Sequence, residues 1–168
     1  MAGEYHRPIC SKHQCCVGYV APMAVTESRE ITIDATPREI LDVLFDLESL
    51  PEWSPAHQEI EVLERDADGR PSRSRQVVKI VGISDEQELA HVVHPDGVGW
   101  TLISAQQQRA QEARYTLTPV GDSTHVRFDI TVDPIVPLPS FLIKRGAKGL
   151  LETATTGLRD RVLQVKKG

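Results

Sequence analysis

The most constraining feature of this sequence is a long apolar repeat near its C-terminal end. Its members recur at steps of three and four residues and are Ala147, Leu151, Ala154, Leu158 and Val162. This spacing predicts an amphipathic α-helix. Because the three prolines of 134–139 cannot lie inside a helix, the helix is expected from about Ser140 to Val165. It would be about 39 Å long at 1.5 Å per residue, so most of the domain has to pack along it.

Three glycines interrupt the predicted helix, at Gly146, Gly149 and Gly157. Each lowers helix propensity by about 1 kcal/mol relative to alanine. They indicate either a close approach by a neighbouring element or ligand, or a kink, or positions where a glycine is simply tolerated.

Most of the chain before this helix consists of segments in which apolar and polar residues alternate. The last segment is the clearest, since Val126, Phe128 and Ile130 point one way whereas Arg127 and Asp129 point the other. Short turns with Gly or Asp join several of them, which predicts an antiparallel meander. The predicted strands are 28–35, 57–65, 73–83, 86–93, 100–107, 112–118 and 124–132.

A short helical region follows the first strand. Thr36 and Pro37 form a helix start, and Glu39 completes a capping box with Thr36. The apolar stripe of this helix is expected to lie in the core. The segment 50–55 is bounded by prolines and predicts a turn or a second short helical piece.

These elements predict one α+β domain at 23–168. A curved antiparallel sheet of about seven strands would wrap on the long C-terminal helix, with a short helix pair after strand one. Only 5% of the residues are aromatic, so large side chains are too few to fill the space between sheet and helix. We therefore expect an apolar cavity of the kind that binds small ligands.

Residues 1–22 differ from the rest of the chain. They contain all three cysteines, and with His6 and His13 they form a short His/Cys tract. Adjacent Cys15 and Cys16 do not suit one tetrahedral zinc ion, so we expect no metal and interpret the segment as disordered or as a non-native extension upstream of Met23. The absence of cysteine from the remaining chain is compatible with a cytoplasmic protein.

The segments 33–37, 45–47 and 50–55, which include Pro51, Glu52 and Trp53, carry a resemblance to a known family. They resemble the START-like (SRPBCC) superfamily, and within it the polyketide cyclase/dehydrase and lipid-transport group with its coenzyme Q-binding and actinobacterial members. The resemblance covers about residues 26–166. It implies a helix-grip fold and hydrophobic ligands, but no single activity, because carriers and cyclases share this scaffold. We expect no cofactor.

Candidate acid or base groups are few. Among the histidines at 57, 91, 94 and 125, His91 shares a strand face with Leu89 and Val93 and is the one expected to point inward. With Tyr115 and Ser104 it forms a weak set of catalytic candidates, for which plain core packing is the simpler interpretation. No nucleophilic triad, phosphate loop or metal-spaced cluster occurs in the domain.

The predicted ligand-binding residues are apolar or aromatic side chains on the inward faces of the strands and the last helix, together with one tryptophan after the first helix. They are Trp53, Val78, Ile80, Trp100, Leu102, Tyr115, Phe128, Ile130, Leu151, Ala154 and Leu158.

The leading functional hypothesis is binding or transport of a hydrophobic small molecule such as a lipid, quinone or polyketide. The alternative is a polyketide aromatase/cyclase or dehydratase that uses polar groups in the cavity. The chain is acidic overall, at −5, although its last 25 residues are basic, which argues against nucleic-acid binding. The apolar and then basic segment 135–148 predicts transient contact with an anionic membrane surface, or else packs as an ordinary loop. We expect a monomer or weak dimer, and a protein-interaction role remains a third hypothesis.

Overall fold

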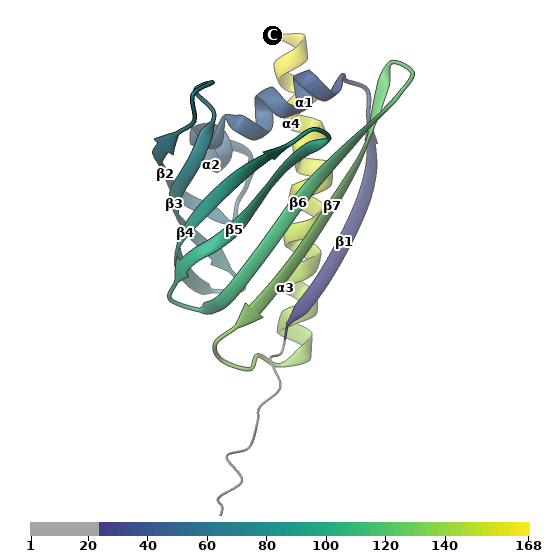
Figure 1. Cartoon of the computed structure of the whole chain (residues 1–168). Helices are drawn as coiled ribbons and strands as arrows, with labels where there is room; N and C mark the ends of the chain where they lie inside the picture. The colour runs from purple at the N-terminus through teal and green to yellow at the C-terminus, as the bar shows by residue number, and fades with distance from the viewer. Residues whose placement is uncertain (1–23) are drawn as a thin grey trace, which may run out of the picture.

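The structure, a computed structural model, describes residues 24–168, and the expectations for residues 1–22 lie outside this range. Seven antiparallel strands form one curved sheet (Figure 1) in the order β1-β7-β6-β5-β4-β3-β2. The strands are β1 (Val25–Ile33), β2 (His57–Arg65), β3 (Pro71–Ile80), β4 (Ile83–His94), β5 (Gly97–Ala105), β6 (Gln108–Val120) and β7 (Ser123–Pro134). The predicted meander is confirmed, and β1 extends it by pairing with β7.

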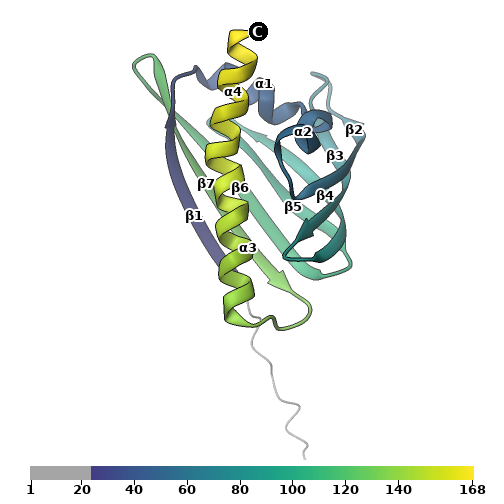
Figure 2. The same cartoon turned by 180° about the vertical axis from the view of Figure 1, so that it is seen from behind.

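One long C-terminal helix crosses a face of this sheet (Figure 2). It consists of α3 (Ser140–Glu152), a π-helical turn η2 (Thr153–Gly157) and α4 (Leu158–Lys167). The prediction of a single closing helix is confirmed, whereas the π turn was not predicted. A Cβ at Gly146 would lie 3.0 Å from Cγ2 of Ile80, so this glycine allows a close approach of α3 to β3.

The helix pair after β1 closes one end of the sheet beside α4 (Figures 1 and 2). It contains α1 (Pro37–Phe45), a 3-10 turn η1 (Leu47–Ser49) and α2 (Leu50–Trp53). The predicted capping box is present, because the Glu39 backbone N–H donates to Thr36 Oγ1 at 3.3 Å and Glu39 Oε2 accepts from the Thr36 N–H at 2.7 Å. Within residues 24–168, no helix combines the length and apolar composition that a transmembrane span requires.

The main apolar core lies where α1, the C-terminal helix, β1 and the β6–β7 hairpin meet. Ile33, Ile40, Val126, Phe128 and Leu158 are each at most 1% exposed there. The opposite face of the sheet carries ion pairs, such as that of Arg127 with Glu30 and Asp129. The alternation predicted for β7 is therefore confirmed.

Two local features of the sheet depart from the sequence prediction. The expected strand 73–83 is broken by a two-residue turn, because Val81 and Gly82 have positive φ angles of 46° and 84°. In β5, Leu102 pairs with Leu89 but Ser104 pairs with Glu88, which leaves Ile103 as the extra residue of a β-bulge.

Candidate functional site

Two adjoining chambers lie between the sheet and the C-terminal helix, each about 170 Å³ in volume. The first chamber lies under α1 and α2 and includes Trp53, Trp100 and Tyr115 in its lining. The second lies between α3 and the β3–β4 turn and includes Val81 and Leu142. They share part of their lining, namely Val78, Ile80, Gln87, Gln108, Ile130, Val132 and Leu150. An engineered apolar cavity of about 150 Å³ holds a benzene ring, so this interior is large enough for an organic ligand.

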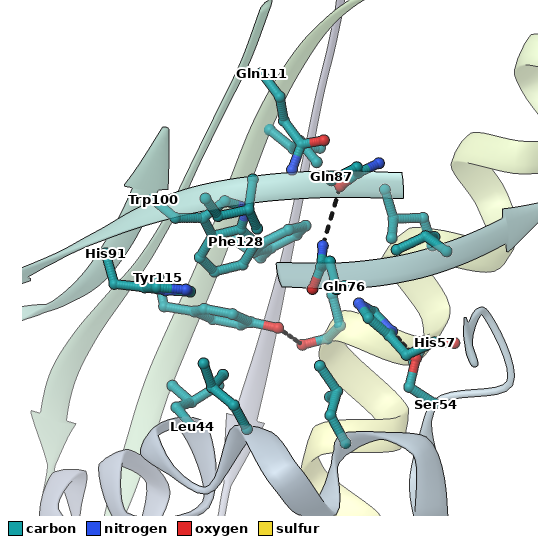
Figure 3. Close-up of a pocket in the computed structure, with 18 of the residues that line it drawn as sticks. Leu44, Ser54, His57, Gln76, Gln87, His91, Trp100, Gln111, Tyr115 and Phe128 are labelled. Carbon is teal, nitrogen blue, oxygen red and sulfur yellow. Dashed lines mark hydrogen bonds between the residues drawn. The ribbon is translucent and has the colours of Figure 1, made fainter. Parts of the chain in front are cut away.

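An aromatic wall forms one side of the first chamber (Figure 3). The rings of Tyr115 and Phe128 have centroids 4.6 Å apart, and Trp100 lies 6.1 Å and 6.0 Å from them. Neighbouring strands bring these residues together, since Tyr115 and Phe128 are cross-strand partners on β6 and β7. The three rings are tilted to one another by 34° to 47° and form a largely apolar surface, which suits an aromatic or hydrocarbon ligand.

The Tyr115 hydroxyl donates to the carbonyl oxygen of Ala154 at 2.9 Å. A π turn interrupts the regular hydrogen-bond ladder of a helix, and Ala154 lies within that turn. Burial raises the pKa of Tyr115 above its usual range. Its hydroxyl is thus neutral and already has an acceptor, and it joins the sheet to the closing helix.

His57 also lines the first chamber, at the start of β2. Its Nδ1 lies 2.6 Å from Oγ of Ser54, which is 1% exposed. Burial lowers the pKa of His57 to about 4, so the ring is neutral near pH 7. His57 was not among the residues expected to point inward, because the alternation in β2 does not identify an inward face.

His91 points into the same chamber from β4 (Figure 3). Its Nε2 lies 2.8 Å from Oγ of the buried Ser74, and its ring centroid is 6.3 Å from that of Trp100. Burial lowers the pKa of His91 to about 4. Both cavity histidines are therefore uncharged polar groups that are each hydrogen-bonded to one serine.

Glutamine side chains form a polar band where the two chambers meet, and sequence reasoning missed them. We define the amide belt as Gln76, Gln87 and Gln108. Gln76 Nε2 donates to Gln87 Oε1 at 3.0 Å. Both Gln87 and Gln108 then donate to Oδ2 of Asp85, at 3.1 Å and 2.8 Å. Asp85 is 6% exposed, and its Oδ1 accepts the backbone N–H groups of Gln106 and Gln107, each at 2.9 Å.

Three buried polar atoms of the cavity lining have no hydrogen-bond partner among residues 24–168. They are Nε1 of Trp53, Nε1 of Trp100 and Oε1 of Gln108. Buried polar groups usually have a partner, and leaving one without it costs free energy. These atoms therefore have unused hydrogen-bonding capacity, but neighbouring atoms enclose them, so a ligand or a water molecule reaches one only after a lining side chain shifts.

The structure brings most of the residues selected from the sequence to the cavity. Those that line the first chamber are Trp53, Val78, Ile80, His91, Trp100, Tyr115, Phe128, Ile130 and Ala154. Leu151 lines the second chamber. Leu158 is fully buried in the core, and Leu102 is half-buried outside both chambers.

Ser104 lies on the outer face of the sheet and is exposed. Without the bulge, Ser104 would lie on the same face of β5 as Trp100. The extra residue at the bulge turns Ser104 to the opposite face. Ser104 thus shares a face with Glu88, which forms an ion pair with Arg73. Within residues 24–168, no cluster of His, Cys, Asp and Glu is arranged to hold a metal ion.

Several solved structures have the same fold as this chain. A START superfamily protein from Mycobacterium smegmatis is 30% identical, with a TM-score of 0.75 over 83% of this chain and 98% of that one. A protein of Thermus thermophilus is 21% identical, with a TM-score of 0.70 over 84% of this chain and 99% of that one. The Zhui aromatase/cyclase from Streptomyces sp. R1128 is 11% identical, with a TM-score of 0.68 over 84% and 94%. The last two show the fold alone.

No curated protein matches the sequence. A family described as "Polyketide cyclase / dehydrase and lipid transport" matches residues 24–163, which is nearly the whole described chain. The mycobacterial protein supports the same assignment, and the resemblance seen in the sequence is confirmed. This chain belongs to the polyketide cyclase/dehydrase and lipid-transport family of the START-like superfamily.

Proposed function

We propose that this protein binds and carries a hydrophobic small molecule of the lipid, quinone or polyketide kind in the two chambers. The observation that carries this proposal is the interior between sheet and helix, which holds two chambers of about 170 Å³ each, the first of them lined by an aromatic wall. Burial of apolar ligand surface there contributes roughly 25 cal/mol per Å². The family description, which names both enzymes and lipid transport, agrees with this class of ligand.

The polar groups of the cavity favour binding over chemistry. A general base works best when its pKa lies near the operating pH, whereas burial holds the pKa of His57 and His91 at about 4. Tyr115 is the third candidate for an acid or base. Burial raises its pKa, and its hydroxyl already donates to Ala154. A dehydratase, or an aromatase/cyclase like the Streptomyces protein of the same fold, would need a substrate that displaces one of these contacts.

We further propose that the carrier is cytoplasmic, acts as a monomer or weak dimer, and meets a membrane through 135–148. Ile135, Val136 and Phe141 are 39%, 56% and 69% exposed in this segment, and Lys144 and Arg145 follow them on exposed positions of α3. Leu138 and Leu142 of the same segment line the second chamber. Exposed apolar side chains beside cations suit an anionic bilayer, and a ligand leaving this chamber would enter the membrane directly.

A cavity-filling variant tests the carrier function. Val78 is 4% exposed and lines both chambers, so Val78→Phe places a ring in the space that the ligand would occupy. Native mass spectrometry of protein purified from its host is expected to show an apolar ligand on the unaltered chain, and at least about tenfold less on Val78→Phe, because lost contacts of about 1.4 kcal/mol already reduce affinity tenfold.

The control is Val120→Phe, the same substitution at a position that is 57% exposed and outside both chambers. It is expected to retain the ligand. Equal occupancy in the two variants, or no ligand on the unaltered chain together with no uptake of added hydrophobic probes, would contradict the proposal.

A further inference from the structure

We infer that the amide belt is a recognition subsite for a hydrogen-bond donor of the ligand, a hydroxyl or N–H group placed between two apolar parts. This inference rests on the proposed function and adds a chemical requirement to it. Apolar contacts alone would admit any hydrocarbon of suitable size, whereas the amide belt favours ligands that carry a hydroxyl or N–H donor.

Asp85 fixes the orientation of the Gln87 and Gln108 amide groups in the belt. The four atoms that contact its carboxylate are N–H donors, two from backbone amides and two from Gln87 and Gln108. Because a carboxylate oxygen accepts and an amide offers both a donor and an acceptor, each of these glutamines has to turn its NH₂ group toward Asp85. Its carbonyl oxygen must then point away from the carboxylate.

The two carbonyl oxygens differ in what they contact. Oε1 of Gln87 accepts from Nε2 of Gln76, as Figure 3 shows. Oε1 of Gln108 is buried and accepts from nothing within residues 24–168. The belt therefore holds an acceptor that cannot reverse into a donor without breaking the 2.8 Å bond of Gln108 to Asp85. Neighbouring atoms cover this oxygen, so a ligand reaches it after a small shift of a lining side chain.

The position of this acceptor defines the ligand further. Gln108 lines both chambers, so a donor group that reaches it lies between the aromatic wall on one side and the apolar lining of the second chamber on the other. A hydroxyl there satisfies a buried acceptor, whereas an ether or a methyl group leaves it unpaired. Such an unpaired group lowers affinity by roughly tenfold.

Three probes of the same ring system test the inference: 2-naphthol, 2-methoxynaphthalene and 2-methylnaphthalene. They offer respectively a donor, an acceptor only, and neither. Titration calorimetry on the full chain is expected to show 2-naphthol binding roughly tenfold more tightly than either of the others.

Two variants assign the preference to the belt. Gln108→Met keeps the length of the side chain and removes the acceptor, so the ratio of affinities for 2-naphthol and 2-methoxynaphthalene should fall to about one. In Asp85→Asn, an NH₂ group can replace one carboxylate oxygen and turn Gln108 around. The ratio should then reverse in favour of 2-methoxynaphthalene. Thermal melts confirm that each variant is folded.

The matched control is Gln106→Met, because Gln106 is exposed and contacts Asp85 only through its backbone N–H. It should keep the preference for 2-naphthol. Equal binding of all three probes to the unaltered chain would overturn the inference and leave the carrier function standing, whereas no binding of any probe would remove both. A preference that survives in folded Gln108→Met would also overturn the inference, and the comparison on the unaltered chain decides the matter if no variant folds.

Discussion

At the scale of single residues, burial decides the chemistry of the cavity. His57 and His91 each keep one serine as a hydrogen-bond partner, and no acidic side chain hydrogen-bonds to either within the described chain. Since desolvation disfavours the charged form of an imidazole, both rings remain neutral at pH values where a histidine in water is already protonated. The cavity therefore stays uncharged around these positions and favours an apolar occupant.

Protonation of these histidines should make the fold sensitive to acid. Burial lowers their pKa from 6.5 to about 4, so the unfolded chain binds more protons than the native one between these pH values. The stabilisation is fully present above pH 6.5 and is lost as the pH falls toward 4. Each histidine should lower the free energy of unfolding by about 1.4 kcal/mol per pH unit in this window.

Urea unfolding between pH 4 and pH 7 measures this slope. In the double variant His57→Asn/His91→Asn the slope should decrease clearly, whereas His125→Asn, on the exposed outer face, serves as the control. A slope that is the same in the double variant and the unaltered chain would contradict the assignment to the cavity histidines.

At the scale of elements, the β3–β4 hairpin is held in an unfavourable conformation. Val81 has a φ of 46°, in the left-handed region, where a β-branched side chain is a costly exception. The hairpin tip is nevertheless packed, because Val81 lines the second chamber and its Cγ1 would lie 3.9 Å from a Cβ at Gly146. The contact with α3 thus opposes the backbone strain at this turn.

Relief of this strain should stabilise the protein. Val81→Asn introduces a residue that tolerates positive φ, and it should raise the free energy of unfolding by about 1 kcal/mol. Val120→Asn makes the same change at a residue whose own φ is not positive, and it should bring no such gain. Thermal or urea unfolding compares the two, and a loss of stability in Val81→Asn would mean that packing of the valine outweighs the strain.

The elements were predictable from the sequence where their periodicity is strong. The alternation of β7 and the repeat from Ala147 to Val162 define a sheet and a closing helix without further information. The bulge at Ile103 was not predictable, because it contains none of the glycine, asparagine or proline signals that mark such features. As a result, Ser104 was assigned to the wrong face of its strand. The turn at Val81 contains Gly82, but the β-branched residue before it makes the run resemble one continuous strand.

The candidate site was predictable only in its apolar part. Inward alternation identified Val78, Trp100 and Phe128 as lining residues. The same alternation also places Gln76 on the face of Val78, yet a glutamine on a strand gives no sign of whether it contacts solvent or a buried carboxylate. The amide belt depends on Asp85, whose role becomes visible only when the folded sheet brings the start of β4 close to the start of β6.

At the scale of the whole molecule, three exposed cations, Lys144, Arg145 and Lys148, lie at the same end of the C-terminal helix as the exposed Phe141. The body of the chain is acidic, whereas the segment from Lys144 to the C-terminus contains seven basic and two acidic residues. The exposed Phe141 lies at the start of α3, next to the lining of the second chamber. This distribution would orient the protein so that this chamber faces an anionic surface.

Vesicle binding tests that orientation. Sedimentation with anionic vesicles should exceed that with neutral vesicles, and reversal of three exposed cations in Lys144→Glu/Arg145→Glu/Lys148→Glu should reduce it at least about tenfold, since each basic residue near such a surface contributes about 1 kcal/mol. Lys167→Glu, at the opposite end of the helix, should bind normally. Equal binding to both kinds of vesicle would contradict the proposed contact.

The bond between Tyr115 and Ala154 has a consequence for the shape of any ligand. A phenol ring stands between β6 and η2 and ends in a hydrogen bond of 2.9 Å, so the length of one tyrosine side chain sets the height of the interior at that point. The C-terminal helix cannot move closer to the sheet at this point while the hydrogen bond between Tyr115 and Ala154 is present. A ligand must therefore be slim enough to lie beside the Tyr115 ring rather than across it.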